Sequence, residues 1–455
     1  MAGVRRVLRD TGLESSITVE TIARVGYRLQ AHAALPAKAA GVPPAPADVA
    51  EPQAAQPRPD RSGRRLVAGV ALAALVGGAA VLAWRRARPG PHPDPALVKA
   101  QALMGQAQQA LRLARPDADL QAAVLFAQAV EHAPDHAPGW GRLALARRQV
   151  AEAAASDQYL GARTATEEAI ARALALDPRQ PDALAARVLS VPAFGSWARV
   201  DESLQAVLKI HPGHLPTLDA LSYLLASAGG VVGHYAMRQK TVSGDPLHAG
   251  YNFRSIYSHW MNGDIGAADR AGERGLDLWP DHFPTWLARS DLFAFSGRPE
   301  RALAMLDDAA LRPVLPPALA ASMRSTWVAL ASGRVADRSA ARETVLGGVA
   351  AGGPLLALHA SMMLAGLGEV QLALDVSEAY LLERGPLIAG TSWRPGQLLH
   401  NDLRRRMTNY LFLPVMAAVR EDPRFAGIAR DVGLVSYWQR PGRKPDYLGQ
   451  RPLPG

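Results

Sequence analysis

AAVLFAQAVEHAPDHAPGWGRL, at residues 122–143, is the clearest structural unit in this chain. Its first half carries small and large apolar residues at helical spacing, with Ala122 and Phe126 on one face. Pro134 then ends the helix, because proline cannot continue the backbone hydrogen-bond ladder. A second apolar stretch begins at Trp140. The segment therefore predicts two helices joined by a short turn, in which small residues let the helices touch and large ones fill the gap to a neighbour.

Prolines recur along the chain at a fixed interval. Pro178, Pro212, Pro246 and Pro280 lie 34 residues apart, which is the period of tetratricopeptide repeats. Each proline is expected to close one helix and start the turn to the next. The period predicts a mainly α-helical solenoid of stacked hairpins with a concave groove. Partial copies of the small-and-large pattern accompany it at Ile170 and Ala173, Leu204 and Val207, Ala268 and Trp286, and Ala302, Leu306 and Ala309.

The predicted solenoid covers residues 87–394, and its signal is strongest before residue 312. Glycine supports the assignment, because it tolerates the positive φ that short turns between helices require. Gly263, Gly297 and Gly333 stand at the expected turns.

The end of the chain is predicted to hold one more hairpin and then a cap at 395–455. The hairpin is expected at 356–385, with Gly368 as its turn. In the cap, DPRF at Asp422–Phe425 is expected to start a short helix, and GLVSYW at Gly433–Trp438 to end it. Such a cap would cover the last apolar face of the solenoid.

Composition excludes several classes of protein. The 455 residues are 49% hydrophobic but only 6% aromatic, with Ala and Leu dominant, which favours helix over sheet. The chain has no cysteine, so disulfides, Cys-based zinc sites and thiol nucleophiles are ruled out. The net charge of +9 is concentrated near the N-terminus, where residues 1–65 hold ten basic and six acidic residues. The predicted solenoid is nearly neutral, which argues against DNA binding there.

A single apolar stretch predicts a transmembrane helix at 65–86. Residues 66–84 read LVAGVALAALVGGAAVLAW without a charge, and basic residues flank both ends, so the charges do not set an orientation. The alternative is a buried Ala-rich helix. Gly69, Ala73 and Gly77 recur every fourth residue, which favours a homodimer face or arises by chance in an Ala/Gly-rich span. Residues 32–64 are rich in Ala and Pro and are predicted to be an extended linker.

The first thirty residues contain a second informative pattern. GVRRVLRD indicates the end of a basic helix, and SSITVETIARVGYRL predicts a β-hairpin with a strand near 17–22 and a turn at 23–26. Gly26-Tyr27-Arg28-Leu29 resembles the motif that closes the wing of OmpR/PhoB-type winged-helix domains. Residues 1–31 would then be the C-terminal fragment of such a domain. The resemblance implies DNA contacts from Arg5, Arg6 and Arg9 at the recognition helix and from Arg24 at the wing.

The order of these parts resembles that of CadC/ToxR-like membrane-anchored regulators. The resemblance implies an inner-membrane protein with one span, a cytoplasmic N-terminus and periplasmic repeats. A winged helix of this type needs about a hundred residues, and its first two-thirds are absent from the sequence. A start codon assigned too late, a gene remnant and a chance hairpin are the three explanations.

No catalytic motif is present in the sequence. The phosphate loop, the H-E-x-x-H zinc motif and the G-x-S-x-G elbow are all missing. His211 and His214 flank a Pro-Gly turn, where a surface turn is favoured over a metal site. We therefore expect no enzymatic activity, cofactor or metal.

Two functions fit these observations. One is a membrane-anchored transcriptional regulator whose repeats sense a signal or partner and whose winged helix binds DNA. The alternative is a membrane-anchored scaffold that binds a protein or peptide in the solenoid groove without touching DNA.

Overall fold

The computed structural model describes residues 94–154, 157–352, 354–387 and 406–449, together with two strands near the N-terminus. The chain divides into two compact units, Met1–Pro93 and Asp94–Gly455. In the first unit, β1 (Ile17–Ile22) and β2 (Gly26–Ala31) pair antiparallel, with Ile17 opposite Ala31. This pairing alone does not identify a winged helix, and the rest of the predicted fragment lies outside the described residues.

The predicted membrane localisation requires correction. None of the helices in the described part of the chain is both long and apolar enough to span a bilayer. The predicted transmembrane helix at 65–86 and the linker at 32–64 lie outside that part. We predicted an inner-membrane protein with a cytoplasmic N-terminus and periplasmic repeats. That prediction is wrong on this finding, because no described helix can form the span.

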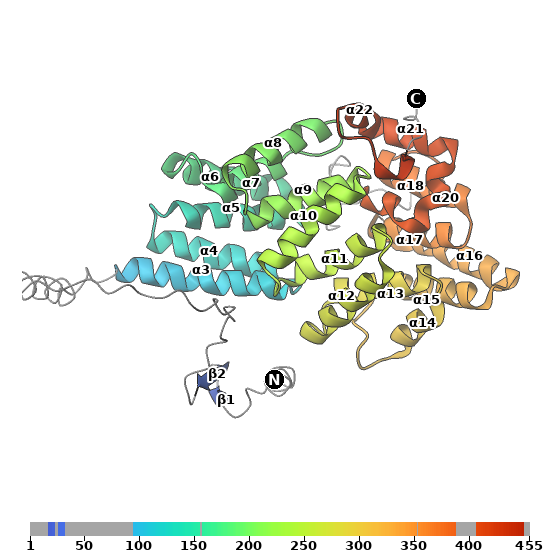
Figure 1. The fold of residues 1–455 in the computed structure, drawn as a ribbon, viewed down its shortest axis with the longest axis horizontal. Coiled ribbons are helices and arrows are strands. Elements are labelled where there is room, and N and C mark those ends of the chain that lie inside the picture. Colours follow the sequence, from blue (N-terminus) through green and yellow to red (C-terminus); the bar gives the residue numbers. More distant parts are fainter. Residues whose placement is uncertain are drawn as a thin grey trace, which may run out of the picture. The chain divides into compact units, whose positions relative to one another are not determined.

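The second unit is an α-helical solenoid, as the sequence predicts. Between Pro95 and Leu382 its helices form eight consecutive hairpins (Figure 1). The hairpins are α3 (Pro95–Leu113) with α4 (Ala118–His132), α5 (Ala137–Glu152) with α6 (Tyr159–Leu176), α7 (Pro181–Leu189) with α8 (Trp197–Ile210), α9 (Leu215–Ser227) with α10 (Val231–Gly244), α11 (Ala249–Met261) with α12 (Ile265–Leu278), α13 (Phe283–Phe295) with α14 (Pro299–Asp307), α15 (Pro317–Ser332) with α16 (Val335–Gly352), and α17 (Pro354–Gly366) with α18 (Val370–Leu382).

The 34-residue period of the sequence is also a period of backbone conformation. The helices α6, α8, α10 and α12 are each followed by a single C-cap residue. The next residue is in each case one of the four prolines that lie 34 residues apart. The turns inside three successive hairpins hold glycines 34 residues apart, Gly229, Gly263 and Gly297, with φ of 76°, 80° and 79°. Gly333 and Gly368 occupy the corresponding turns of two later hairpins, at intervals of 36 and 35 residues, with φ of 64° and 82°. Prolines and glycines thus set where each helix stops.

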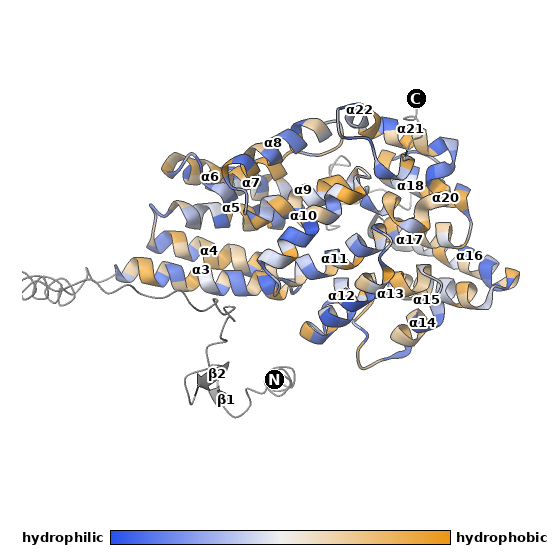
Figure 2. Cartoon of the chain, in the orientation of Figure 1, coloured by the Kyte–Doolittle hydropathy of each residue, from blue (hydrophilic) through white to orange (hydrophobic). Residues whose placement is uncertain are grey.

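The small-and-large pattern forms the contacts between helices. Ala122, Phe126, Ala268 and Ala302 are fully buried. Trp286, predicted to pack, is 2% exposed, whereas Trp140 is only partly buried and donates a hydrogen bond from Nε1 to the carbonyl of Pro134 at 2.8 Å. Figure 2 shows hydrophilic and hydrophobic residues alternating along many of the helices, as expected where a helix buries one side.

The C-terminal cap is built from short helices. DPRF starts a helix as predicted, with the Asp422 side chain accepting from the backbone N–H of Arg424. GLVSYW does not end that helix but forms another. Gly433, at φ 84°, interrupts the helical backbone and is the N-cap of the second helix. The elements are η2 (Asn409–Phe412), η3 (Pro414–Met416), α20 (Ala417–Glu421), α21 (Pro423–Asp431), α22 (Leu434–Trp438) and η4 (Asp446–Leu448).

The cap also connects two distant parts of the solenoid. On one side it packs on α17 and α18. On the other, Trp438 Nε1 donates to the carbonyl of Ala228 at 2.8 Å, and Trp197 Nε1 donates to the carbonyl of Val432 at 2.7 Å. Thr408 Oγ1 donates to the carbonyl of Ser227 at 2.9 Å. The last hairpin is therefore joined back to α8 and α9, and the hairpins from α8 to α18 form a closed ring; Figure 1 shows α22 beside α8.

Candidate binding groove

The first helices of successive hairpins line the inner surface of the solenoid. α5, α7 and α9 contact one another in turn, as do α11 with α13 and α15 with α17. A cavity of about 450 Å³ lies on this surface between α3, α4 and α5 on one wall and α9, α11 and α13 on the other. An ion pair between Arg112 Nε and Asp245 Oδ2, 2.8 Å long, ties the end of α3 to the end of α10. The first six hairpins thus curl into a groove with two facing walls.

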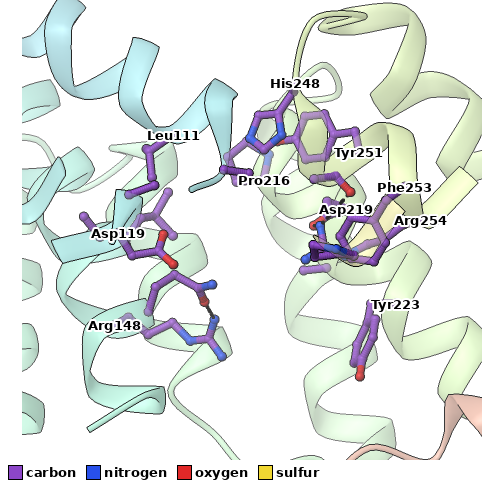
Figure 3. A pocket seen from close by; sticks show the side chains of 18 of the residues that line it. Leu111, Asp119, Arg148, Pro216, Asp219, Tyr223, His248, Tyr251, Phe253 and Arg254 are labelled. Carbon is purple, nitrogen blue, oxygen red and sulfur yellow. Dashed lines mark hydrogen bonds and ion pairs between the residues drawn. The ribbon is translucent and has the colours of Figure 1, made fainter. Parts of the chain in front are cut away.

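The two walls carry different side chains (Figure 3). Leu111, Asp119 and Arg148 lie on the α3–α5 wall. The opposite wall is aromatic and cationic, and its side chains are those of Asp219, Tyr223, His248, Tyr251, Phe253 and Arg254. The Arg254 guanidinium carbon lies 5.1 Å from the centre of the Phe253 ring, which is within cation–π range. The groove therefore offers flat apolar surfaces beside charged groups.

One aspartate on this wall forms ion pairs with two arginines. Asp219 pairs with Arg238 from α10 through Oδ1 and with Arg254 from α11 through Oδ2, the latter at 3.2 Å. Burial raises the pKa of the Asp219 carboxyl, but the two guanidinium groups outweigh it and hold the pKa below its usual value. Because one carboxylate faces two cations, the cluster keeps one net positive charge.

Histidines cap the inner helices on this side. His248 precedes α11 and stacks on Tyr251, with ring centres 3.9 Å apart and planes 14° apart. His282 precedes α13, and its Nδ1 lies 2.7 Å from Thr285 Oγ1. Burial, aided by the charge of Arg254, lowers the pKa of both imidazoles to about 4. Both are therefore neutral at pH 7 and leave the arginines to set the charge of the groove.

The arrangement at His282 also occurs at His214, two repeats earlier. Its Nδ1 lies 2.7 Å from Thr217 Oγ1, and its Nε2 lies 3.0 Å from Asp182 Oδ1. The sequence predicts a surface turn here, and Pro212 and Gly213 of that turn are exposed, whereas the His214 side chain is only 9% exposed. The signal was present in the sequence, because HLPT at 214–217 and HFPT at 282–285 are 68 residues apart, which is twice the period.

On the α3–α5 wall, Asp119 is the acidic group. Burial raises the pKa of its carboxyl, and the nearby charges of Arg148 and Arg254 oppose that rise. The charge of Arg254 thus lowers the pKa of Asp119 across the groove as well as that of Asp219 on its own wall. The arrangement suits a ligand that has apolar or aromatic groups and at least one polar group able to pair with a guanidinium.

Arg5, Arg6, Arg9 and Arg24 lie outside the described residues, so their assignment to DNA contact stays a prediction. None of the groove residues was predicted individually, because the sequence shows which helices form but not which of their polar faces point inward.

No family model matches this sequence, and no curated protein matches it. Among solved structures, the chain is similar to a tetratricopeptide repeat protein from Parabacteroides merdae, with 14% identity over 56% of this chain and 93% of that chain and a TM-score of 0.35. It is also similar to yeast Tom70, with 11% identity over 76% and 69% of the two chains and a TM-score of 0.36. For the tetratricopeptide repeat domain of P58(IPK), the identity is 12% over 73% and 92%, with a TM-score of 0.20. Because these scores are low, the solenoid fold is established by the helix pairs and period of the chain itself.

Proposed function

We propose that residues 94–449 form a scaffold that binds an extended segment of a protein partner along the concave groove. The observation that carries the proposal is the 450 Å³ cavity between α3–α5 and α9–α13, lined by aromatic and charged side chains. Pockets of this size fall within the ~300–1,000 Å³ range of binding sites. A groove between rows of parallel helices suits an extended chain, because successive repeats present side chains at regular intervals along it.

The chemistry of the walls favours a segment with aromatic or aliphatic side chains and an acidic group. Phe253 is only partly buried and offers its ring to apolar side chains. Arg254 shares its carboxylate partner with Arg238, so it retains capacity to bind a carboxylate from a ligand. Arg112 and Asp245 hold α3 against α10, which fixes the width of the groove before a partner arrives. Preorganisation of this kind lowers the entropic cost of binding.

We also propose that this unit does not catalyse a reaction. The ionisable groups near the groove are engaged in structural pairs, such as Asp219 with two arginines and Asp182 with His214. The scaffold proposal uses only the described helices. The DNA-binding regulator predicted from the N-terminal pattern gains no support from the fold or the similar structures, and it is not part of the proposal.

Filling the groove with a large side chain tests the proposal. Gln149 lines the cavity from α5 and is exposed, so Gln149→Trp fills space without disturbing the core. Peptides selected from a random display library against the full chain are expected to bind the Gln149→Trp protein at least about tenfold more weakly, as is typical when a binding pocket is occluded. Affinity is measured by isothermal titration calorimetry.

The control places the same residue outside the groove. Leu160 on α6 is 72% exposed and does not line the cavity, so Leu160→Trp is expected to leave peptide affinity unchanged. Equal affinity of the selected peptides for the wild-type and Gln149→Trp proteins would place the binding surface elsewhere and refute the proposal.

A further inference from the structure

A second cavity lies inside the ring that the cap closes. Its volume is about 340 Å³, and it is bounded by α9, α10, α11, α13, α17 and the segment 407–413 of the cap. It shares Tyr223, Phe253, Arg254 and Pro284 with the groove cavity, so the two spaces meet at one aromatic and cationic wall. Ring closure by the cap is what gives this inner cavity its far side.

Most of the inner cavity is apolar. Carbon-rich side chains from four helices and the cap surround it, and its volume lies at the small end of the ~300–1,000 Å³ range for small-molecule sites. The apolar lining residues are Ala226, Met261, Phe283, Leu287, Leu358, Met362 and Leu413. An aliphatic chain of moderate length fits such a lining.

One end of the cavity is cationic. Arg238 lines it and is fully buried, and its Nη1 is used by Asp219 and by Thr241. Its Nε and Nη2 are buried and have no hydrogen-bond partner among the described residues. Buried guanidinium N–H groups are normally paired, because leaving them unpaired is costly. Two donors therefore remain for a ligand at this end.

The charge of the lining points to an anion. Arg238 and Arg254 line the inner cavity, and the described residues that line it include no carboxylate. Asp219, behind them, compensates only one of the two positive charges. His234 and His359 also line the cavity, but burial lowers the pKa of each to about 4, so they are neutral at pH 7.

We propose that the inner cavity binds a medium-chain organic carboxylate, with its carboxylate at Arg238 and Arg254 and its aliphatic chain among Met261, Leu287 and Met362. A carboxylate supplies the two acceptor oxygens that a guanidinium pairs with most strongly. The chain supplies the apolar volume. This site is distinct in its ligand from the peptide groove, and its test needs no protein partner.

Octanoate is the probe, titrated into the full chain by isothermal titration calorimetry. We expect saturable binding at one site per chain. Octanol has the same chain without the charge and is expected to bind at least about tenfold more weakly, as is butyrate, which has the charge without the chain.

Two variants locate the site independently. Arg238→Met removes the charge but keeps an unbranched apolar stem, and it is expected to weaken octanoate binding at least about tenfold. Leu358→Trp fills the cavity and leaves both arginines in place, so binding is expected to be lost even if the Arg238 variant fails to fold. Leu160→Trp is the matched control and should bind octanoate like the wild type.

Three results would overturn the proposal. They are the absence of saturable octanoate binding, equal binding of octanol and octanoate, and unchanged octanoate binding by a folded Leu358→Trp protein. N-acetyl-leucine serves as a further arm, since it mimics the carboxyl end of a polypeptide. Saturation by N-acetyl-leucine without saturation by octanoate would show that the cavity recognises a chain terminus, and the assignment to a free aliphatic acid would be rejected.

Discussion

Replacing Asp291 by asparagine is expected to stabilise the protein by about 4 kcal/mol above pH 7. Asp291 lies on α13 with 1% of its surface exposed. Tyr257 OH donates to its Oδ2 at 3.0 Å, whereas its Oδ1 has no partner among the described residues. Burial raises the pKa of the Asp291 carboxyl to about 7, and the bond from Tyr257 only partly opposes this. Ionised Asp291 is therefore a cost to the fold that a neutral amide of similar shape avoids.

The pH dependence of the gain identifies its cause. The carboxyl has a pKa of 3.8 in the unfolded chain and of about 7 in the folded protein. Between these values the unfolded chain binds fewer protons, so ionisation of Asp291 destabilises the fold progressively as the pH rises from about 4 to 7. The advantage of Asp291→Asn over the wild type is expected to grow across this range and to be constant above it. Denaturant unfolding at a series of pH values measures it.

The difference in stability between Asp291→Asn and the wild type is free of the effects of groups that titrate equally in both proteins. Buried histidines such as His234 and His282 have lowered pKa values and change the stability of both proteins alike. Asp307→Asn is the control, since the Asp307 side chain is 62% exposed, and it should reproduce the wild-type profile. A difference between Asp291→Asn and wild type that does not vary with pH would show that Asp291 is not a neutral acid in the fold.

Gly229→Ala is expected to destabilise the protein by roughly 2–5 kcal/mol, the sum of backbone strain and overpacking. Gly229 has φ 76°, which L-residues rarely adopt. A Cβ at this position would lie 2.7 Å from Cε1 of Phe412 and 3.1 Å from Cβ of Pro445 in the cap. The carbonyl of Gly229 also accepts from the N–H of Asp446 at 3.0 Å. The added methyl group would therefore push the cap from the point where the ring closes.

Gly263 provides a matched control one repeat later. Its φ is 80°, but a Cβ there would meet no atom within 4 Å. Gly263→Ala is therefore expected to cost only the backbone strain, about 1–2 kcal/mol. Free energies of unfolding in urea give both values. Equal losses for the two variants would mean that the cap does not press on Gly229 and that the ring is open in solution.

The parts of the fold that the sequence predicts are those that depend on local interactions. Pro178 and its three successors end helices wherever they occur, because the restriction is in the residue itself. Gly263, Gly297 and Gly333 mark turns because glycine itself tolerates the positive φ that these turns need. Ala122 and Phe126 pack between adjacent helices, which are close in sequence, so their spacing alone predicts their role.

The ring and the groove depend on contacts between residues far apart in the chain. Trp438 and Ala228 are separated by 210 residues, and no spacing in the sequence indicates that they meet. The same holds for the cap residues that bound the inner cavity, including Asn409 and Leu413. No motif in the sequence singles out Arg238, and its burial beside Asp219 on α9 depends on how α9 and α10 pack.

The N-terminal predictions have a different outcome. The motif behind the winged-helix resemblance lies in β2, but a pair of strands does not identify that domain. The arginines assigned to DNA contact lie outside the described part of the chain, so they stay predictions. The inner-membrane localisation is corrected. The span was predicted from one apolar stretch and its placement from the regulator resemblance, whereas no helix in the described part is able to span a bilayer.

Site-specific photo-crosslinking tests the central claim, which is that a partner segment binds in the concave groove. A benzophenone side chain is placed at Tyr223, which lines the groove, or at Leu160 on the outer helix α6, and each protein is irradiated with a selected peptide. The account predicts crosslinking from position 223 that unlabelled peptide suppresses, and none from position 160. Crosslinking from position 160 with none from position 223 would place the partner on the outer surface and contradict it.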